Sequence, residues 1–468
     1  MTRAERTIAV SACVGLACAA RVTWAYWRHT DSLFLRMKSS VWVALAWTFA
    51  HGEFYRPVLG AGGYGGTRYM PLFFVLHGAL IRAGADPIWS GVALMHLSVA
   101  AAAVALFAAQ RQLDVPTRLA LPVAAMVWAT VIFQQSATDL SPDYLAAALA
   151  LFAATAAMRG RSIGAACLFV SAAATKLTAI AFAAPIVAVL WCDRRRSDSR
   201  GLALSTLALF VGVTAAIDLA SAGRFHRALV SGTAAGLTAR EGLDALPQFA
   251  FELAIKPIDV ALPFAAAVWC AVARRAPAWA AAYLVTAALV AIAIFAAPGT
   301  ASNHLVDLHL ASLLVVGAAL ARGGLPARAA TGMFAAIAVM LVAITIPLPG
   351  VPSVVAEVQA ALPRPREAAI SAHADLTRGP YLAIDPIVPV LNGDRPWVVD
   401  YGSLERFYAE RTPAGLDLES RVRRHFFSAI VVPDGYESDL MPLLRSEYPR
   451  ALECRPFVVL RSAERADE

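Results

Sequence analysis

Apolar stretches of roughly membrane length alternate with short polar clusters along the first three quarters of the chain. A helix that crosses the hydrocarbon core needs about 20 largely apolar residues, and the pattern predicts eleven such spans. They cover residues 7–25, 88–109, 119–133, 144–158, 163–175, 177–191, 202–219, 260–273, 279–296, 305–321 and 329–346. The pair 163–175 and 177–191 has short halves joined at Lys176, which favours a re-entrant or strongly bent arrangement.

One polar interval departs from this alternation. The first predicted outer loop, residues 26–87, carries acidic, basic, Trp and Tyr residues over a length at which membrane loops are usually short. Within it, residues 32–50 have apolar positions at helical spacing and predict a helix lying in the interface. Residues 70–80 are apolar but too short to span, because only about 14 residues separate Arg68 from Arg82. The loop is therefore a candidate active site.

The composition changes after the last predicted span. Residues 1–346 form the predicted membrane module, residues 347–375 a Pro-rich connector, and residues 376–468 a small soluble domain. The segments YLAID, PWVVD, SAIVVP and PFVVL predict strands, and residues 416–426 and 438–448 predict helices. The fold class is thus an α-helical polytopic membrane protein with about 11 transmembrane helices and a C-terminal α/β domain.

Composition agrees with a membrane protein, since 59% of the residues are hydrophobic and 16% are charged, against about 25% charged in soluble domains. The net charge of +7 comes from short arginine clusters between apolar stretches, which set topology and do not suggest a nucleic-acid partner. With residues 70–80 at the outer surface, these clusters all face inside. We therefore expect a multi-pass protein of the cytoplasmic (inner) membrane, with its N-terminus cytoplasmic and its C-terminal domain extracytoplasmic.

Three outward-facing segments carry ionisable residues beside apolar spans. The first holds His29 and Asp31, the second (QQSATDLSPDY) holds Asp139 and Asp143, and the third (PGTASNHLVD) holds Asn303, His304 and Asp307. In the predicted topology they share one compartment with Lys176 and Lys256. Ionisable groups in membranes are costly and tend to be functional, so their convergence predicts a site.

Asp31 suits a general base, because a partly desolvated carboxylate at the bilayer surface can take a proton from an acceptor hydroxyl. The same position also suits a helix N-cap, and the two roles are compatible. Asp139 is a candidate second catalytic acid. With Asp143 it could also bind a divalent cation, Mg²⁺ or Mn²⁺, through oxygen ligands, although the sequence DLSPD equally describes the start of a helix.

Basic residues of these segments are candidates for holding a phosphate, because Arg offers a bidentate fork and Lys a point charge. The candidates are Arg56, Arg68, Lys176 and His304. Arg56 and Arg68 could instead be solvated loop charges, whereas a lone Lys in an apolar run of some 30 residues needs a partner. The candidate acceptor- or sugar-binding residues are His29, Glu53, Tyr69 and Asn303.

Several short motifs resemble those of the GT-C glycosyltransferases that use polyprenyl-phosphate sugars, in the branch of protein O-mannosyltransferases and lipid A aminoarabinose transferases. They are HTDSLFLRMKSS after the first span, RYMPLFFVLHGAL at the end of the loop, TDLSPDYLAAALALF in the second outer segment and SNHLVDLHLASLL at a late span. The tail segment GPYLAIDPIVPVLNGDRPWVVDY also resembles the soluble tail of bacterial members.

This resemblance implies a polyprenyl-phosphate sugar as donor, a glycan, lipid or protein as acceptor, and an inverting displacement outside the membrane with Asp31 as base. A membrane-facing cavity would hold the polyprenyl chain, and basic residues would hold the leaving phosphate. Two features depart from the family pattern: Ser32 follows Asp31 where many relatives have Glu, and the second segment lacks Asp-x-Asp. The alternatives are a lipid or sugar transporter or flippase, against which no related halves are found, and an inactive scaffold with the same fold.

Overall fold

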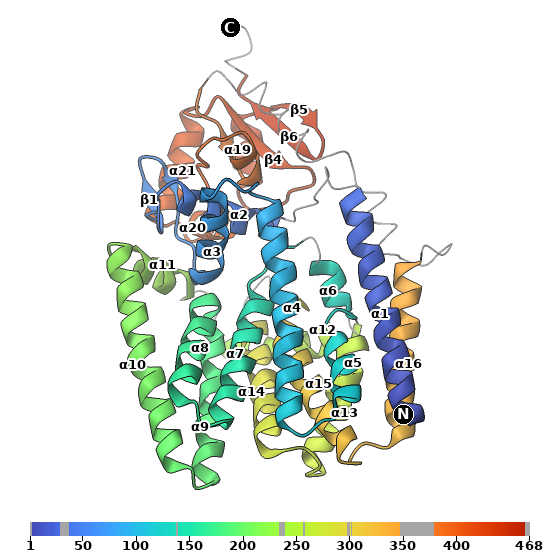
Figure 1. The fold of residues 1–468 in the computed structure, drawn as a ribbon. Helices are drawn as coiled ribbons and strands as arrows, with labels where there is room; N and C mark the ends of the chain where they lie inside the picture. The colour runs from blue at the N-terminus through green and yellow to red at the C-terminus, as the bar shows by residue number, and fades with distance from the viewer. Residues whose placement is uncertain are drawn as a thin grey trace.

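The computed structural model describes residues 2–28, 37–136, 139–233, 239–255, 258–296, 300, 302–346 and 379–463. A bundle of long helices carries a smaller layer of helices and strands on one end (Figure 1). The chain begins at the opposite end of the bundle, and the C-terminal domain forms the far side of the smaller layer. This layer also includes the first loop, so segments from both ends of the sequence build it.

Six helices in the described part of the chain are long and apolar enough to cross a membrane. They are α1 (Arg3–Arg28), α4 (Trp89–Gln112), α10 (Arg196–Ala220), α14 (Ala278–Phe295), α15 (Val306–Ala321) with the preceding 3₁₀ turn η3 (Ser302–Leu305), and α16 (Ala327–Thr345). Shorter apolar helices are α3 (Leu72–Arg82), α7 (Asp143–Met158), α8 (Ser162–Thr175), α9 (Ala183–Cys192) after the 3₁₀ turn η2 (Leu177–Phe182), and α13 (Ile258–Val272). The polytopic helical fold predicted from the sequence is confirmed.

Helix α15 lies at the centre of the bundle. Its residues Val306 to Ala319 are all buried, and it contacts α4, α5, α7, α13 and α14. A helix that is apolar around most of its circumference is stable when it is surrounded, which fits the apolar run of α15 after Ser312. The alanine-rich α7 packs against α4 and α8, because small side chains let membrane helices approach closely.

The predicted span 119–133 is interrupted in the structure. Helix α5 (Thr117–Ala125) ends in turns, and a second helix, α6 (Val131–Ser136), follows. The amide of Val131 donates to Oδ2 of the buried Asp259 at 2.8 Å. A free amide at a helix start must find a partner inside a membrane protein, and Asp259, far away in the sequence, supplies it. Hydropathy alone could not reveal this break.

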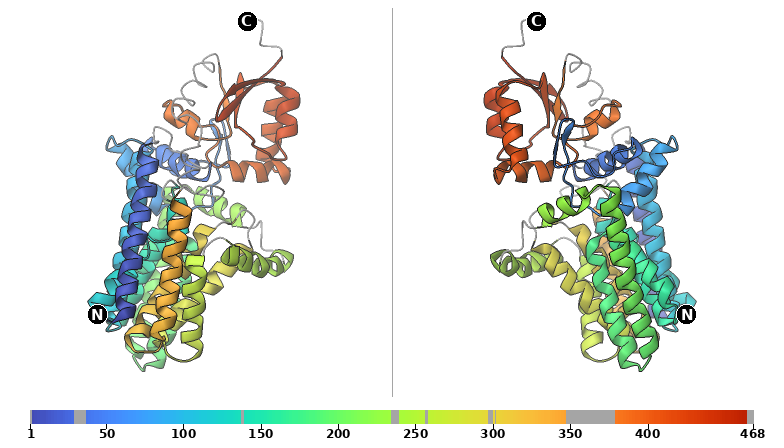
Figure 2. Two further views of the ribbon diagram at one scale, coloured as in Figure 1. Left: turned by 90° about the vertical axis from the view of Figure 1, so that its right-hand side faces the viewer. Right: turned by 90° about the vertical axis from the view of Figure 1, so that its left-hand side faces the viewer.

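Two helices were not predicted. Helices α11 (Arg224–Thr233) and α12 (Ala239–Ile255) follow α10; α11 lies across the upper end of the bundle, and α12 projects from its side (Figure 2). The ring of Phe225 on α11 contacts Tyr55 of the first loop at 5.3 Å between centroids. Charged and apolar residues alternate on α11, so its pattern is too polar for a span, and its position depends on this tertiary contact.

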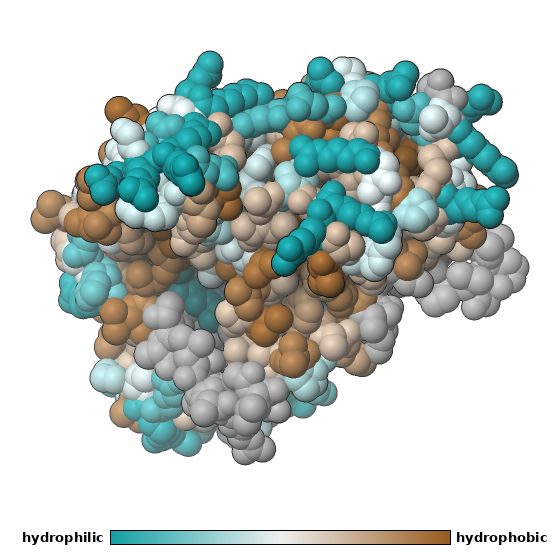
Figure 3. All heavy atoms as spheres, turned by 90° about the horizontal axis from the view of Figure 1, so that it is seen from below, coloured by the Kyte–Doolittle hydropathy of each residue, from teal (hydrophilic) through white to brown (hydrophobic). Residues whose placement is uncertain are grey.

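The arginine-bearing helix ends gather at the end of the bundle opposite the C-terminal domain. Arg118 pairs with Glu5 at 3.0 Å, and Arg195 donates to the Met158 carbonyl at 2.7 Å. Viewed from this end, hydrophilic side chains form a band across one side of the face, with hydrophobic groups between and beside them (Figure 3). That this end faces the cytoplasm remains a prediction from the positive-inside rule.

The C-terminal domain contains a four-stranded sheet in the order β3-β4-β6-β5. Strand β3 (Leu382–Ala383) is parallel to β4 (Ala429–Pro433), which is antiparallel to β6 (Phe457–Arg461), and β6 is antiparallel to β5 (Arg450–Cys454). Its helices are α19 (Ile387–Leu391), α20 (Tyr401–Ala409), α21 (Pro413–Arg423) and α22 (Met441–Glu447). Strand β5 and helices α19 and α20 were not predicted.

The predicted strand PWVVD does not join this sheet. Val398 forms only an isolated bridge with Tyr64, which belongs to the loop hairpin of β1 (Leu59–Gly60) and β2 (Gly63–Tyr64). The Tyr64 amide donates to the Trp397 carbonyl at 2.6 Å, and the Tyr64 hydroxyl donates to Asp417 at 2.8 Å. A Cβ on Gly63, where φ is +122°, would lie 2.2 Å from the Trp397 carbonyl oxygen, so glycine is required there. The hairpin thus docks on the C-terminal domain.

Candidate functional site

Three chain segments bring polar side chains together at the end of the bundle beneath the first loop. Asp143 is the first residue of α7, Asn303 and His304 lie in η3, and Asp307 lies in the first turn of α15. Lys176 lies at the junction of α8 and η2. We call Asp143, Lys176, Asn303, His304 and Asp307 the Asp143 cluster.

Asp143 is the centre of this cluster and is only 2% exposed. Its Oδ1 lies 2.5 Å from Nζ of Lys176 and 3.4 Å from Nδ1 of His304. Its Oδ2 accepts hydrogen bonds from Nδ2 of Asn303 at 2.7 Å and from the Ser141 hydroxyl. A buried carboxylate is tolerated when donors surround it, and here they come from segments 160 residues apart in the sequence.

Lys176 breaks the helical path between the predicted spans 163–175 and 177–191. Its backbone is extended, with φ −148° and ψ 113°, and this carries the chain from α8 into η2. Its ammonium also lies 3.9 Å from Oδ2 of Asp307. The bent arrangement expected at Lys176 is thus present, and the partner that a lone membrane lysine requires is Asp143.

Asp307 has an unused acceptor. Its side chain is buried, and its Oδ1 makes no hydrogen bond with any residue that the structure describes. A buried oxygen without a donor is costly. The cluster therefore has capacity for one further donor group, such as a ligand hydroxyl.

Lys38 approaches the same cluster, and the sequence analysis did not select it. It lies at the start of α2 (Met37–Ala50) and is half-buried. Burial lowers the pKa of Lys38 more than the charges of Asp143 and Asp139 raise it. A signal was available, because the chain has only three lysines and two of them, Lys38 and Lys176, interact electrostatically here.

Asp139 is tied to the first loop. The Ser39 hydroxyl donates to Oδ1 of Asp139 at 3.1 Å and accepts from the Leu140 amide at 2.9 Å. Helix α2 is thereby fixed over the second outer segment. Asp139 lies close enough to influence Lys38, so its predicted place near the site agrees with this geometry.

Arg68 and Tyr69 lie on the loop side of the site. The Tyr69 ring is 4.5 Å from the Trp42 ring between centroids. Burial raises the pKa of the Tyr69 phenol, and the charges of Asp400 and Asp143 raise it further. Arg68 is exposed, and its charge acts on both Lys38 and Tyr69. Both residues therefore border the Asp143 cluster.

Arg56 and Glu53, predicted to bind phosphate and acceptor, contact each other and the C-terminal domain, which favours a structural role for both. Arg56 is buried, pairs with Glu53 at 2.8 Å and donates to the Pro396 carbonyl, while Glu53 also pairs with Arg395. These contacts join the first loop to the C-terminal domain. With its donors committed to protein oxygens, Arg56 has a structural role.

The remaining candidates of the first loop are His29 and Asp31, which lie outside the described residues. Helix α1 ends at Arg28, and helix α2 begins at Met37. The role of Asp31 as a general base therefore stays a prediction.

The Asp143 carboxylate does not fit the predicted divalent cation. Mg²⁺ and Mn²⁺ require oxygen ligands, whereas Asp143 is contacted by the ammonium of Lys176 and the amide nitrogen of Asn303. In the part of the chain that the structure describes, no group of three or more His, Cys, Asp or Glu side chains could hold a metal.

An apolar groove opens between α1 and α4 at the same end of the bundle. Its volume is about 750 Å³, and its lining includes Trp24, Trp89, Trp128, His96 and Phe133. Trp24 is 61% exposed, so the groove opens on the side of the bundle, where the membrane lies. Nε2 of His96 in this wall makes no hydrogen bond with any described residue.

Comparisons with known proteins show which solved structures have a similar fold. No protein-family model matches the sequence, and no curated protein matches it. The structure is similar to that of ArnT from Cupriavidus metallidurans in the apo state, with a TM-score of 0.58, 15% identity and coverage of 96% of this chain and 97% of that chain. It is also similar to ArnT from the same organism bound to undecaprenyl phosphate, with a TM-score of 0.56, 13% identity and the same coverage. The chain shares the fold of these ArnT structures over nearly its whole length, so the predicted fold class, a helical polytopic membrane protein with a small C-terminal α/β domain, is confirmed.

Proposed function

We propose that this protein is a membrane glycosyltransferase that moves a sugar from a polyprenyl-phosphate donor to an acceptor hydroxyl on the extracytoplasmic side. The observation that carries the proposal is the Asp143 cluster, a buried polar site with Lys38 and Arg68 at its edge, on a fold shared with ArnT. One ArnT structure holds undecaprenyl phosphate. Buried ionisable groups at the end of a membrane bundle are costly and are kept where function needs them.

The donor phosphate would bind between Lys38 and Arg68. Neither side chain forms an ion pair or hydrogen bond with a residue that the structure describes, whereas Lys176 is already compensated by Asp143. Two cations beside a partly buried site, neither in direct contact with a described carboxylate, suit a phosphate, with Arg68 able to bind two oxygens. Lys176 and His304, within the Asp143 cluster, would act on the phosphate at longer range, with Lys176 adding positive potential.

The polyprenyl chain would lie in the groove between α1 and α4. This groove is apolar, opens toward the membrane and lies at the same helix ends as the Asp143 cluster. Tryptophans line the mouth of the groove, as expected where a lipid meets the membrane interface. The phosphate could then sit at the bilayer surface while the chain stays in an apolar environment.

Asp31 would act as the general base. Its carboxylate would take the proton of the acceptor hydroxyl while the hydroxyl oxygen attacks the anomeric carbon from the face opposite the phosphate. The bond between that carbon and the phosphate oxygen breaks, and the polyprenyl phosphate leaves with the electron pair, so the configuration inverts. Stabilising the leaving phosphate by fixed cations typically contributes several kcal/mol, which gives Lys38 and Arg68 a large share of the catalysis.

The test uses purified protein in lipid nanodiscs and a panel of radiolabelled polyprenyl-phosphate sugars, with a detergent extract of the envelope as acceptor. We expect covalent transfer from at least one donor, loss of transfer in Asp31→Asn with donor binding retained, and weaker donor binding in Lys38→Met. Arg322→Gln, an exposed charge at the opposite end of the bundle, is the control. Sugar flux into liposomes without a covalent product would establish a transporter instead. Full activity of Asp31→Asn would refute the proposed base.

A further inference from the structure

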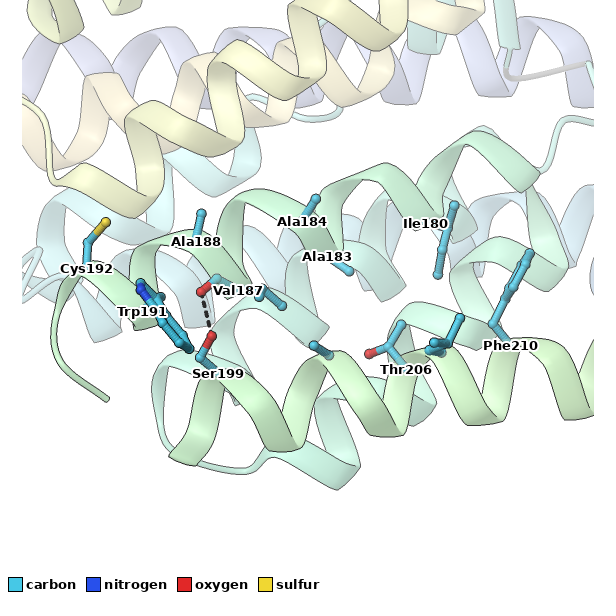
Figure 4. A pocket seen from close by; sticks show the side chains of 12 residues that line it. Ile180, Ala183, Ala184, Val187, Ala188, Trp191, Cys192, Ser199, Thr206 and Phe210 are labelled. Carbon is cyan, nitrogen blue, oxygen red and sulfur yellow. Dashed lines mark hydrogen bonds between the residues drawn. The ribbon is translucent and has the colours of Figure 1, made fainter. Parts of the chain in front are cut away.

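A second apolar groove runs along the bundle from Ile180, four residues after Lys176, to the end of α9. It runs between α9, with the preceding turn η2, and α10, and has a volume of about 550 Å³ (Figure 4). Ile180 and Phe210 lie at one end, and Trp191, Cys192 and Ser199 lie at the other. The Ser199 hydroxyl donates to the Val187 carbonyl at 2.9 Å and joins the two helices at the second end.

The groove has the depth of one membrane leaflet. Its wall on α10 extends from Ser199 to Phe210, which at 1.5 Å per residue is about 16 Å, close to half of a hydrocarbon core of about 30 Å. Leu204 and Leu207 on α10 are 68% and 62% exposed, so this side of the helix faces lipid. An apolar channel of this depth on the membrane side accommodates an acyl chain.

Two arginines stand at the rim of this groove. The guanidinium carbons of Arg196 and Arg200 lie 5.4 Å and 5.5 Å from the centre of the Trp191 ring. Both side chains are exposed, and neither forms a hydrogen bond or ion pair with any residue in the described part of the chain. Trp191 holds them over the mouth of the groove through cation–π contacts.

The charges around this rim are uneven. The neighbouring Arg195 is engaged with Asp198 at 2.7 Å and with the Met158 carbonyl, and the exposed Asp193 is the other acidic side chain of this turn. Arg194, Arg196 and Arg200 therefore outnumber the single unpaired carboxylate of Asp193. Basic sites between membrane helices on the cytoplasmic side bind anionic headgroups.

We propose that this groove binds one anionic phospholipid of the cytoplasmic leaflet, with an acyl chain along α9 and α10 and its phosphate on Arg196 and Arg200. Charge complementarity selects an anionic lipid over a zwitterionic one, because Arg194, Arg196 and Arg200 at the rim outnumber the exposed carboxylate of Asp193. The lipid would support α10, which packs mainly on α8, α9 and α11 within the described part of the chain. This inference does not depend on the proposed transferase activity.

The test is native mass spectrometry of the full-length protein after exchange into detergent containing phosphatidylglycerol or phosphatidylcholine. We expect one phosphatidylglycerol to remain bound at collision energies that remove phosphatidylcholine. The double variant Arg196→Gln/Arg200→Gln should bind phosphatidylglycerol about thirtyfold more weakly, since each basic residue near an anionic headgroup contributes several-fold. The control Arg322→Gln/Arg328→Gln removes two exposed arginines of the same end and should bind as the parent does.

A second variant probes the acyl chain separately. Ala203→Leu places a larger side chain in the groove and leaves both rim arginines in place, so it should also weaken retention of phosphatidylglycerol. Equal retention of the two lipids, or equal binding by the Arg196/Arg200 and control variants, would overturn the proposal. A dimer that the Ala203→Leu variant disrupts would assign the groove to a second copy of the chain and would overturn it as well.

Discussion

Lys176 and Asp143 form a buried ion pair, with 2.5 Å between Nζ and Oδ1, although 33 positions separate them in the sequence. One residue lies where α8 gives way to η2, and the other begins α7. The ion pair accounts for the presence of both residues, because a lysine in an apolar run and a carboxylate at a helix start are each costly inside a membrane unless they are paired. The pair anchors a site to which η3 and α15 add the remaining polar groups.

This pairing makes the two side chains energetically dependent on one another. Lys176→Met alone should lower the free energy of unfolding by about 3–5 kcal/mol, because it leaves the buried Asp143 without its cation. The double variant Lys176→Met/Asp143→Asn should recover part of that loss, with a coupling of about 1–3 kcal/mol. Thermal melting of the purified variants in detergent measures both effects. Additive losses would mean that Asn303 and Ser141 already satisfy Asp143 without Lys176.

Lys38 should give donor binding a characteristic pH dependence. Burial lowers its pKa below the ordinary lysine value of 10.5, so as pH rises Lys38 loses its proton earlier than a solvated lysine would. Affinity for undecaprenyl phosphate should therefore fall in the alkaline range in the parent protein. In Lys38→Arg the profile should stay flat, since arginine remains charged. Titration of intrinsic tryptophan fluorescence with the lipid at several pH values gives the two profiles, and identical profiles would exclude Lys38 from the phosphate site.

Arg56 should stabilise the contact between the first loop and the C-terminal domain and contribute little to donor affinity. It is buried and holds Glu53 and the Pro396 carbonyl, so Arg56→Ala should cost about 2–5 kcal/mol by leaving buried polar groups unpaired. The loss should appear as faster amide exchange in the hairpin β1–β2 and in residues 396–399. Donor affinity, measured by the same fluorescence titration, should change less than in Lys38→Met. A larger loss of donor affinity in Arg56→Ala than in Lys38→Met would instead place Arg56 at the phosphate site.

Asp385 should make the C-terminal domain less stable as pH rises. Its side chain is buried two residues after β3 and accepts from the Ile387 amide at 3.0 Å, and burial raises its pKa to about 6. Because the folded-state pKa lies above the unfolded value, the stability that this group contributes is full below pH 4 and is lost as pH rises through 6. Asp385→Asn keeps the acceptor and avoids the buried charge. It should raise stability at pH 7 by on the order of 3 kcal/mol and change little at pH 4.

The comparison of melting curves at the two pH values checks this prediction. A gain of equal size at both would point to packing rather than ionisation. A loss at pH 7 would mean that the Asp385 carboxylate is stabilised by a cation in the protein.

Much of the membrane architecture could be predicted because each span must satisfy its own length and hydrophobicity. The break at Lys176 was foreseen, since one charge in an apolar run signals it. The break between α5 and α6 was not, because the group that satisfies the Val131 amide is Asp259, 128 positions away. In the C-terminal domain, PWVVD has a strand pattern, but Val398 pairs with Tyr64 of the first loop. A local pattern of apolar residues does not specify which distant segment a strand pairs with.

The sequence alone indicated most of the apolar helices and the few ionisable residues placed beside them, because a backbone in lipid must satisfy its own hydrogen bonds and a charge there is rare. Only the tertiary structure decided which of those charges meet. It brought Lys38 to Asp143 and Lys176, and it turned Arg56 and Glu53 toward the C-terminal domain. Hydrophobicity is a property of each segment by itself, whereas the compensation of a buried charge depends on groups that distant segments bring within a few ångströms.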